Sequence, residues 1–185
     1  MEMISNNASM TAIVARACKE AGARLVYASS DEVYGDGDSR EILIPPALPG
    51  SIYGLSKFWG ENAGRLYAPE GFTALRFSML YGPGLQPGRS EVVDCLLRAR
   101  RGRQMLVDAG ERSWCWIGDA VRAARLAIEK GEGAYNIGRG DDAVTTMHVA
   151  ELACILAGNP SNISLPSALR ALAGFPLSLS MTEWR

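Results

Sequence analysis

Histidine is almost missing from this 185-residue sequence, and cysteine is sparse and scattered. The single histidine is His148, and the four cysteines (Cys18, Cys95, Cys115 and Cys154) form no CxxC pair. This pattern argues against a zinc site and against a disulfide framework. We therefore expect no bound metal and reduced thiols, as in a cytoplasmic protein.

The sequence also lacks an excess of charge of either sign and any long apolar run. The sequence contains nineteen Lys and Arg residues and twenty Asp and Glu residues, which gives a net charge of -1. The densest basic run, residues 98–103, is expected to be the solvated end of a helix, not a nucleic-acid-binding face. No run approaches the ~20 apolar residues of a membrane span, and the N-terminus does not resemble a signal peptide. We therefore expect a soluble, cytoplasmic protein that binds neither nucleic acid nor membranes.

Helical and strand patterns alternate along the chain, which predicts an α/β fold with a mainly parallel sheet. Helices are expected over residues 8–21, 51–67, 91–101, 117–130 and about 145–156, and strands over 25–28, 72–77, 105–107 and 134–137. Gly22 should end the first helix. Residues 35–50 and the chain from Gly158 onward are expected to be loops. The length fits one domain.

Two segments carry residues suited to proton transfer. Ser30, Asp31 and Glu32 follow a predicted strand, and Tyr53 and Lys57 lie four residues apart on a predicted helix. Open α/β sheets bind ligands at the carboxyl ends of their strands, and residues four apart share one helix face. The ammonium is expected to lower the pKa of the phenol, so that Tyr53 with Ser30 could take a proton from a sugar alcohol. A Tyr and a Lys at this spacing also occur by chance, so the preceding SSDEVYG segment decides in favour of a site.

Further segments make the chain similar to a known family. They are Asn7 with Thr11, RLVYASS, SDEVYG, YGLSK, LRFSMLYGPG, ERSW, IGDA and GAYNIG. The chain resembles the extended short-chain dehydrogenases/reductases, specifically the NAD-dependent sugar-nucleotide epimerases and dehydratases. The resemblance implies a partial Rossmann-like (doubly wound) parallel sheet with flanking helices and a small, incomplete C-terminal substrate lobe. It implies a single domain, with core elements at about 1–80 and 105–140 and lobe elements at about 82–104 and 141–185.

The resemblance also implies catalytic roles. Ser30, Tyr53 and Lys57 match the family's catalytic Ser/Thr, Tyr and Lys, and Asp31 with Glu32 resembles the acid/base pair of nucleotide-sugar 4,6-dehydratases. In that scheme Tyr53 deprotonates the C4 hydroxyl while hydride passes to NAD. Glu32 then removes the C5 proton as Asp31 protonates the leaving C6 hydroxyl. Neighbouring families vary at this pair, and a solvated loop end is the alternative for it.

Binding of NAD is implied at Tyr53, Lys57, Ser29 and Phe77. The glycine fingerprint that holds a pyrophosphate in such folds is not found in this sequence. We therefore expect the N-terminal dinucleotide-binding segment to be missing. A partner chain would supply the dinucleotide site, or the sequence is a fragment of a longer protein.

Binding of the nucleotide sugar is implied at Arg112, Ser78 and Met79. Arg112 matches an arginine that the family aims at the substrate diphosphate, for which a guanidinium is well suited. Ser113 stands where the family usually has Asp, so the ion pair that orients the arginine is expected to be missing. Met79 stands where the family often has Asn, and its side chain cannot donate those hydrogen bonds.

Two functions remain open at this point. The first is an NAD-dependent epimerase or dehydratase acting on a nucleotide-activated sugar. The second is a truncated, non-redox scaffold or dimerising interaction protein without NAD-dependent activity. Met79 and Ser113 favour a further alternative, a degraded remnant with no activity. The helices over 8–21 and 51–67 resemble the pair through which family members dimerise, so a homodimer is expected in either case.

Overall fold

The computed structural model describes residues 2–35, 49–107, 110–138, 144–159 and 163–164. The chain divides into two compact units, residues 1–84 with 113–142 (unit 1) and residues 85–112 with 143–185 (unit 2). Most of the loop expected over residues 35–50 lies outside the described residues.

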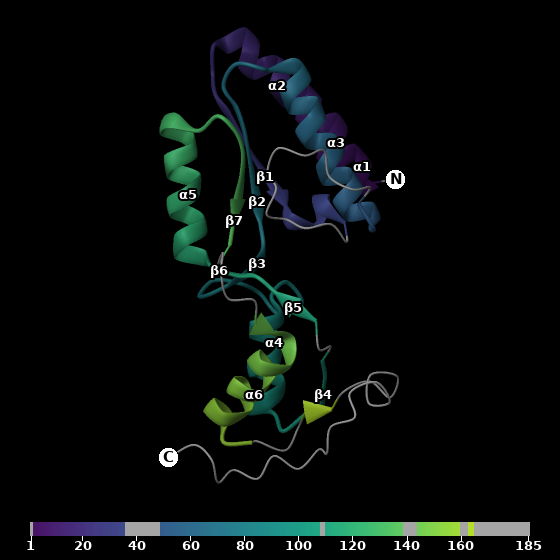
Figure 1. The fold of residues 1–185 in the computed structure, drawn as a ribbon, viewed down its shortest axis with the longest axis vertical. Coiled ribbons are helices and arrows are strands. Elements are labelled where there is room, and N and C mark those ends of the chain that lie inside the picture. The colour runs from purple at the N-terminus through teal and green to yellow at the C-terminus, as the bar shows by residue number, and fades with distance from the viewer. Residues whose placement is uncertain (1, 36–48, 108–109, 139–143, 160–162, 165–185) are drawn as a thin grey trace. The chain divides into compact units, whose positions relative to one another are not determined.

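Unit 1 is built on a parallel sheet of β1 (Leu25–Ser30), β2 (Phe72–Phe77) and β7 (Gly133–Ile137), in the order β1-β2-β7 (Figure 1). Ser30 pairs with Phe77, and Phe77 pairs with Ile137. The three strands therefore end together, and their carboxyl ends form one edge of the sheet. This arrangement confirms the predicted α/β class and the partial Rossmann-like sheet.

Helices cover both faces of this sheet, with α2 (Met10–Ala21) and α3 (Ile52–Tyr67) on one side and α5 (Ile117–Lys130) on the other (Figure 1). The first of these helices is preceded by α1 (Glu2–Ile4) and a π-helical turn, η1 (Ser5–Ser9), so the helical segment starts earlier than predicted. Gly22 ends α2 with a φ of 65°, as the sequence predicts.

Two short features of unit 1, a pair of strands and a turn, are not visible in the sequence pattern. One is the parallel pair of β3 (Met79–Tyr81) and β6 (Trp114–Trp116). The other is η2 (Asp31–Tyr34), a 3-10 turn that follows β1 directly. Three-residue strands are too short to show alternation, and each depends on a partner far away in the sequence.

Unit 2 contains α4 (Glu91–Arg100) and α6 (Thr146–Ala157), which pack around a small core. The core consists of Cys95, Ala99, Met105, Val107, Ala150, Ala153 and Cys154. Two two-stranded sheets complete the unit, β4 (Met105–Leu106) with β9 (Ile163–Ser164), and β5 (Glu111–Arg112) with β8 (Val144–Thr145). Thr145 caps α6 by accepting a hydrogen bond from the backbone N–H of His148.

Strand β9 corrects the expectation that the chain is loop from Gly158 onward. Its two residues form a strand because β4 supplies a pairing edge, which a local pattern cannot reveal. None of the four cysteines, all of which lie in the described ranges, forms a disulfide. Among the helices that the structure describes, none is both long and apolar enough to cross a membrane.

Candidate active site

The candidate site begins where β1 ends and η2 starts. The Ser30 side chain caps η2, because its Oγ accepts a hydrogen bond from the Glu32 backbone N–H at 3.2 Å. The same hydroxyl donates to Asp31 Oδ1 at 3.2 Å. The cap therefore holds the hydroxyl and both carboxylates in one tight turn at the carboxyl edge of the sheet.

Tyr53 and Lys57 come to this edge from the first two turns of α3. Lys57 Nζ donates to the Ala28 carbonyl of β1 at 2.8 Å. It lies 5.6 Å from the ring centroid of Tyr53 and 5.2 Å from that of Tyr27. The structure thus brings together the predicted Ser, Tyr and Lys, and the Tyr53 side chain stays accessible, with 38% of the residue exposed.

The predicted lowering of the Tyr53 pKa is wrong for this chain. Partial burial raises the pKa of Tyr53, the charges of Glu32 and Asp31 raise it further, and a hydrogen bond with Ser30 acts in the opposite direction. Burial, Glu32, Ser30 and Asp31 are the groups and effects that act on this pKa, and the ammonium of Lys57, which donates to the Ala28 carbonyl, is not among them. Burial also lowers the pKa of Lys57 itself.

The two carboxylates of η2 lie in different surroundings. Burial raises the pKa of Asp31, with a further contribution from the charge of Glu32 and an opposing one from the Ser30 hydrogen bond. Glu32 is exposed, and its Oε2 accepts a hydrogen bond from Ser51 Oγ at 2.6 Å. Two adjacent carboxyl groups with such different environments can hold different protonation states.

Ser51 is a functional candidate that the sequence reasoning missed. It is the N-cap of α3, and its Oγ also accepts the backbone N–H of Gly54 at 2.9 Å. One hydroxyl therefore starts the helix that carries Tyr53 and holds the Glu32 carboxylate at that helix terminus, where a negative charge is favoured. A serine just before an apolar helix was the available signal.

The first turns of α3 are also fixed from the N-terminal side. Asn7 Nδ2 donates to Ser56 Oγ at 2.9 Å, and Ser56 Oγ donates to the Tyr53 carbonyl at 2.7 Å. Thr11 Oγ1 donates to the Asn7 carbonyl at 2.6 Å. Gly54 packs so closely on η2 that a Cβ there would collide with the Glu32 carbonyl. The paired Asn7 and Thr11 thus brace the segment that carries Tyr53.

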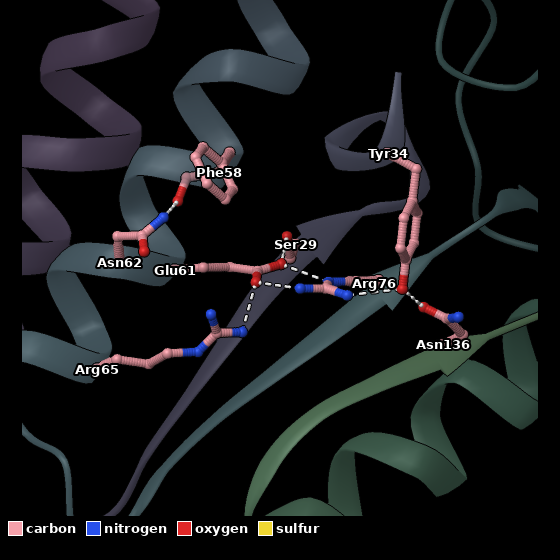
Figure 2. A network of polar contacts seen from close by, with 8 residues as sticks. All are labelled: Ser29, Tyr34, Phe58, Glu61, Asn62, Arg65, Arg76 and Asn136. Atoms are coloured by element: carbon pink, nitrogen blue, oxygen red, sulfur yellow. Dashed lines mark hydrogen bonds and ion pairs between the residues drawn. The ribbon is translucent and has the colours of Figure 1, made fainter. Parts of the chain in front are cut away.

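Behind the site lies a buried polar network (Figure 2). Glu61 of α3 is fully buried and accepts two hydrogen bonds from Arg76 of β2, at 2.9 and 2.7 Å. Ser29 Oγ donates to Glu61 Oε1 at 2.6 Å. The Ser29 hydroxyl is engaged in this network, and its implied contact with the cofactor stays a prediction.

The other implied binding residues of unit 1 follow the end of β2. Phe77 ends the strand between Ser30 and Ile137. The backbone N–H of Ser78 donates to the Ile137 carbonyl at 3.0 Å, and its Oγ donates to the same carbonyl at 3.3 Å. Met79 begins β3, where its N–H donates to the Ser113 carbonyl at 3.2 Å. Phe77 thus lies at the same sheet edge as Ser30.

Arg112 belongs to unit 2, and the structure corrects the expectation that it lacks an ion-pair partner. Its Nε donates to Thr146 Oγ1 at 3.3 Å and lies 3.9 Å from Glu91 Oε2. Glu91 thus provides the acidic partner that Ser113 cannot. The Arg112 side chain is 39% exposed.

Together, a hydroxyl, a phenol, an ammonium and two carboxyl groups meet at one sheet edge. Such a set can deprotonate an alcohol and can protonate a leaving group. No cluster of three or more acidic, His or Cys side chains suited to a metal ion occurs within the described ranges.

Comparison with known proteins relates this chain to a family of enzymes. The profile of the NAD dependent epimerase/dehydratase family matches residues 1–138. A curated relative, the ADP-L-glycero-D-manno-heptose-6-epimerase of Nitratidesulfovibrio vulgaris, is 27% identical over 164 residues, which cover 75% of this chain and 49% of the relative. The corresponding enzyme of Thiobacillus denitrificans is 30% identical over 178 residues, covering 82% of this chain and 52% of the relative.

Solved structures agree with these sequence relatives. The UDP-N-acetylglucosamine 4-epimerase of Bacillus cereus superposes with a TM-score of 0.70 at 28% identity, over 84% of this chain and 57% of that chain. MoeE5 in complex with UDP-glucose and NAD superposes with a TM-score of 0.75 at 29% identity, over 87% of this chain and 57% of that chain. The chain spans about half the length of the relatives it matches.

Proposed function

Because this chain belongs to the NAD-dependent epimerase/dehydratase family, we propose that it takes part in proton transfer on a nucleotide-activated sugar. The observation that carries the proposal is the convergence of Ser30, Tyr53 and Lys57 at the carboxyl edge of the sheet. The curated relatives and solved neighbours include nucleotide-sugar epimerases, whose names give the substrate class of those proteins.

In this proposal Tyr53 is the base that takes a proton from a sugar hydroxyl. Ser30 hydrogen-bonds the phenol, and the positive charge of Lys57 stabilises the phenolate that forms. The raised pKa of Tyr53 means that the chain alone holds the phenol protonated at neutral pH. A further positive charge at the site, such as the nicotinamide ring of NAD, would favour the phenolate.

The finer part of the proposal is dehydration, with Asp31 as acid and Glu32 as base. Glu32 takes the proton on the carbon next to the oxidised position, and the C–O bond of the neighbouring hydroxyl breaks. Asp31 gives that oxygen a proton, so that water leaves and a carbon–carbon double bond forms. The raised pKa of Asp31 suits a proton donor, and the Ser51 hydrogen bond holds Glu32 as an acceptor.

We propose NAD as the cofactor, held at its nicotinamide end by Tyr53 and Lys57 and bordered by Phe77. When bound, NAD supplies an acceptor for the hydride that leaves the sugar carbon. The exposed face of Tyr53 and the adjacent ammonium fit a nicotinamide riboside. Because these 185 residues contain no glycine fingerprint for the pyrophosphate, we propose that residues outside them hold that part of NAD, either in a partner chain or in another part of a longer protein.

We propose that unit 2 contributes the substrate lobe, with Arg112 contacting the diphosphate. The Nε of Arg112 contacts both Thr146 and Glu91. A guanidinium forms paired hydrogen bonds to phosphate oxygens. The substrate class is therefore a sugar joined to a nucleoside diphosphate.

The first test is a calorimetric titration of the full chain with NAD and NADH, followed by incubation with NAD and nucleotide sugars. UDP-glucose, UDP-N-acetylglucosamine and an ADP-heptose are suitable substrates, with mass spectrometry to detect loss of water and NMR to detect epimerisation. We expect saturable NAD binding and conversion of at least one of these sugars. The absence of both NAD binding and sugar conversion would rule out the proposed activity for this chain.

One observation favours a second function, that of a dimerising interaction protein. Large apolar side chains of α2 and α3 are exposed: Met10, Ile13, Val14, Ile52, Trp59, Leu66 and Tyr67. Exposed apolar surface of this kind marks interfaces. We propose a homodimer through α2 and α3, which is compatible with either function. Light scattering should show a dimer, and Ile13→Glu should give a monomer; a monomeric wild-type chain would contradict this.

A further inference from the structure

The carboxylate of Glu61 lies at the centre of the buried network and is shared by three other side chains (Figure 2). Arg76 donates to both of its oxygens, Arg65 Nη2 donates to Oε2 at 2.9 Å, and Ser29 Oγ donates to Oε1. Each carboxylate oxygen thus accepts two hydrogen bonds. Burial disfavours the charged form of Arg76, but the hydrogen bonds and charge of Glu61 outweigh this and raise the pKa of Arg76.

The network is weakly explained by stability alone. A buried ion pair must recover the cost of removing both charges from water, and apolar replacements of such pairs are often neutral or stabilising. Geometric control is an alternative reason to keep charged groups in a core, and it has to be argued for each protein. In this chain the argument comes from the elements that the network joins.

The network joins every element that carries a candidate catalytic group. Glu61 follows Tyr53 and Lys57 on α3 at successive four-residue steps, so the three lie along one side of the helix. Ser29 directly precedes Ser30 on β1. Each link is a hydrogen bond of defined direction, so it fixes both the distance and the orientation of what it joins.

Arg76 extends these links to the turn that carries the carboxylates. Its Nη1 donates to Tyr34 Oη at 2.6 Å, and Tyr34 Oη donates to Asn136 Oδ1 of β7 at 2.7 Å. Tyr34 is buried and is the last residue of η2, three residues after Asp31. The guanidinium of Arg76 also lies 4.9 Å from the centroid of the Tyr34 ring.

We propose that Glu61, Arg76 and Tyr34 are positioning residues that set the distance between Tyr53 on α3 and the Ser30–Glu32 turn. The proposal rests on the proposed function of this site, and it assigns a role to residues that touch no reacting atom. Groups that transfer protons must be held to within about 0.5 Å. A displacement of about 1 Å can cost roughly 10²-fold in rate.

The decisive variant is Tyr34→Phe, which removes one hydroxyl and leaves the ring and the Arg76–Glu61 pair in place. Its readout is the pKa of Tyr53, followed by NMR in protein labelled at the ring carbon of its six tyrosines and assigned with Tyr53→Phe. The pKa of Tyr53 is raised by burial and by Glu32 and Asp31, and Glu61 is not among its causes. Because Tyr34→Phe removes no charged group, a change in this pKa reports a change in the position or solvation of Tyr53.

We expect Tyr34→Phe to change the pKa of Tyr53, because a displaced phenol changes its solvation, its distance from Glu32 and Asp31 and its hydrogen bond with Ser30. Glu61→Gln should change it further, because it weakens the links to Arg76 and Arg65 as well. Tyr135→Phe is the matched control, since the Tyr135 hydroxyl accepts a backbone N–H of the same unit outside the network; it should leave the value unchanged. An unchanged Tyr53 pKa in folded Tyr34→Phe would overturn the proposal, even if Glu61→Gln failed to fold.

This readout separates the proposal from the proposed function, because it requires no turnover. If the chain proves inactive on every nucleotide sugar, the pKa measurement still decides whether the network positions Tyr53. Where turnover is measurable, Tyr34→Phe should lower kcat roughly 10²-fold with little change in KM. A rise in KM at constant kcat would contradict positioning of the reacting groups.

Discussion

The buried network and the candidate catalytic turn lie next to each other in unit 1, yet their polar groups are held in opposite ways. In the network, the carboxylate of Glu61 meets donors on both oxygens and is fully removed from water. In the turn, Tyr53 and Glu32 are exposed, and burial and like charge shift the pKa values of Tyr53 and Asp31 upward. A fully satisfied network makes this part of the core rigid, whereas the exposed groups of the turn are accessible for proton exchange.

The largest effect is expected from Tyr53→Phe, which tests whether Tyr53 acts as the catalytic base. Loss of the phenolic hydroxyl should reduce turnover by about 10³-fold or more, since general-base catalysis contributes about 10²–10⁴-fold. The fold should remain, because the Tyr53 ring is partly exposed. Turnover and thermal melting measure the two effects, with Tyr67→Phe at the end of α3 as the control. Undiminished turnover would remove Tyr53 from the mechanism.

Arg76→Met should disrupt the buried network around Glu61. Removing one partner leaves the buried Glu61 charge uncompensated, which costs about 3–5 kcal/mol of unfolding free energy. Denaturant titration measures this loss, and Arg76→Met combined with Glu61→Leu should recover most of it. Arg122→Ala is the control, because its pair with Asp119 has side chains 77% and 60% exposed and should contribute about 0–1 kcal/mol. If Arg76→Met lost no more unfolding free energy than Arg122→Ala, Arg76 would not be the partner that compensates the buried charge of Glu61.

Glu32→Gln should remove the proposed base of the turn and leave the proposed acid, Asp31, in place. Elimination should stop while oxidation of the sugar persists, because only the second proton transfer needs Glu32. The pKa of Tyr53 should fall, since the charge of Glu32 raises it. Product analysis by mass spectrometry and tyrosine NMR measure the two outcomes. A dehydrated product at the wild-type rate would exclude the dehydratase assignment.

Ser51→Ala tests whether a helix cap also serves the site. Loss of an N-cap side chain costs about 1 kcal/mol, and the matched variant Thr145→Ala removes the cap of α6 from unit 2. Both variants should lose similar stability in melting experiments. Only Ser51→Ala should change the kinetics of dehydration, because only Ser51 donates to a candidate base. Equal activity of the two variants would limit Ser51 to capping.

The smallest effect concerns alkaline pH. Burial, together with the charges of Glu61 and Tyr53, raises the pKa of Tyr27 to about 12, against an opposing hydrogen bond from Thr11. The folded state therefore keeps a proton that the unfolded state loses, so this stabilisation is present below pH 10 and is lost as pH rises from 10 towards 12. Denaturant titrations at about pH 9 and pH 11 measure the unfolding free energy at each pH. Between these two values Tyr27→Phe should lose less unfolding free energy than the wild type. Equal decreases would assign the effect to other groups.

The sequence alone predicted much of the site. Ser30 directly after an apolar strand, with Tyr53 and Lys57 four residues apart on a helix, placed three groups at one sheet edge, and the structure brings them together there. Ser51 and the short strand β9 escaped prediction. Their roles depend on partners elsewhere in the chain, namely Glu32 and β4.

What the sequence determined by itself is the order of helices and strands, the family, and the residues that can carry proton transfer. These follow from local pattern and spacing, which need no partner. Only the tertiary structure decided that Glu61 pairs with Arg76, that Arg76 reaches Tyr34 across 42 positions, and that the pKa of Tyr53 is raised rather than lowered. Pairing and pKa depend on burial and on the distance between charges, and both are set by how distant segments pack.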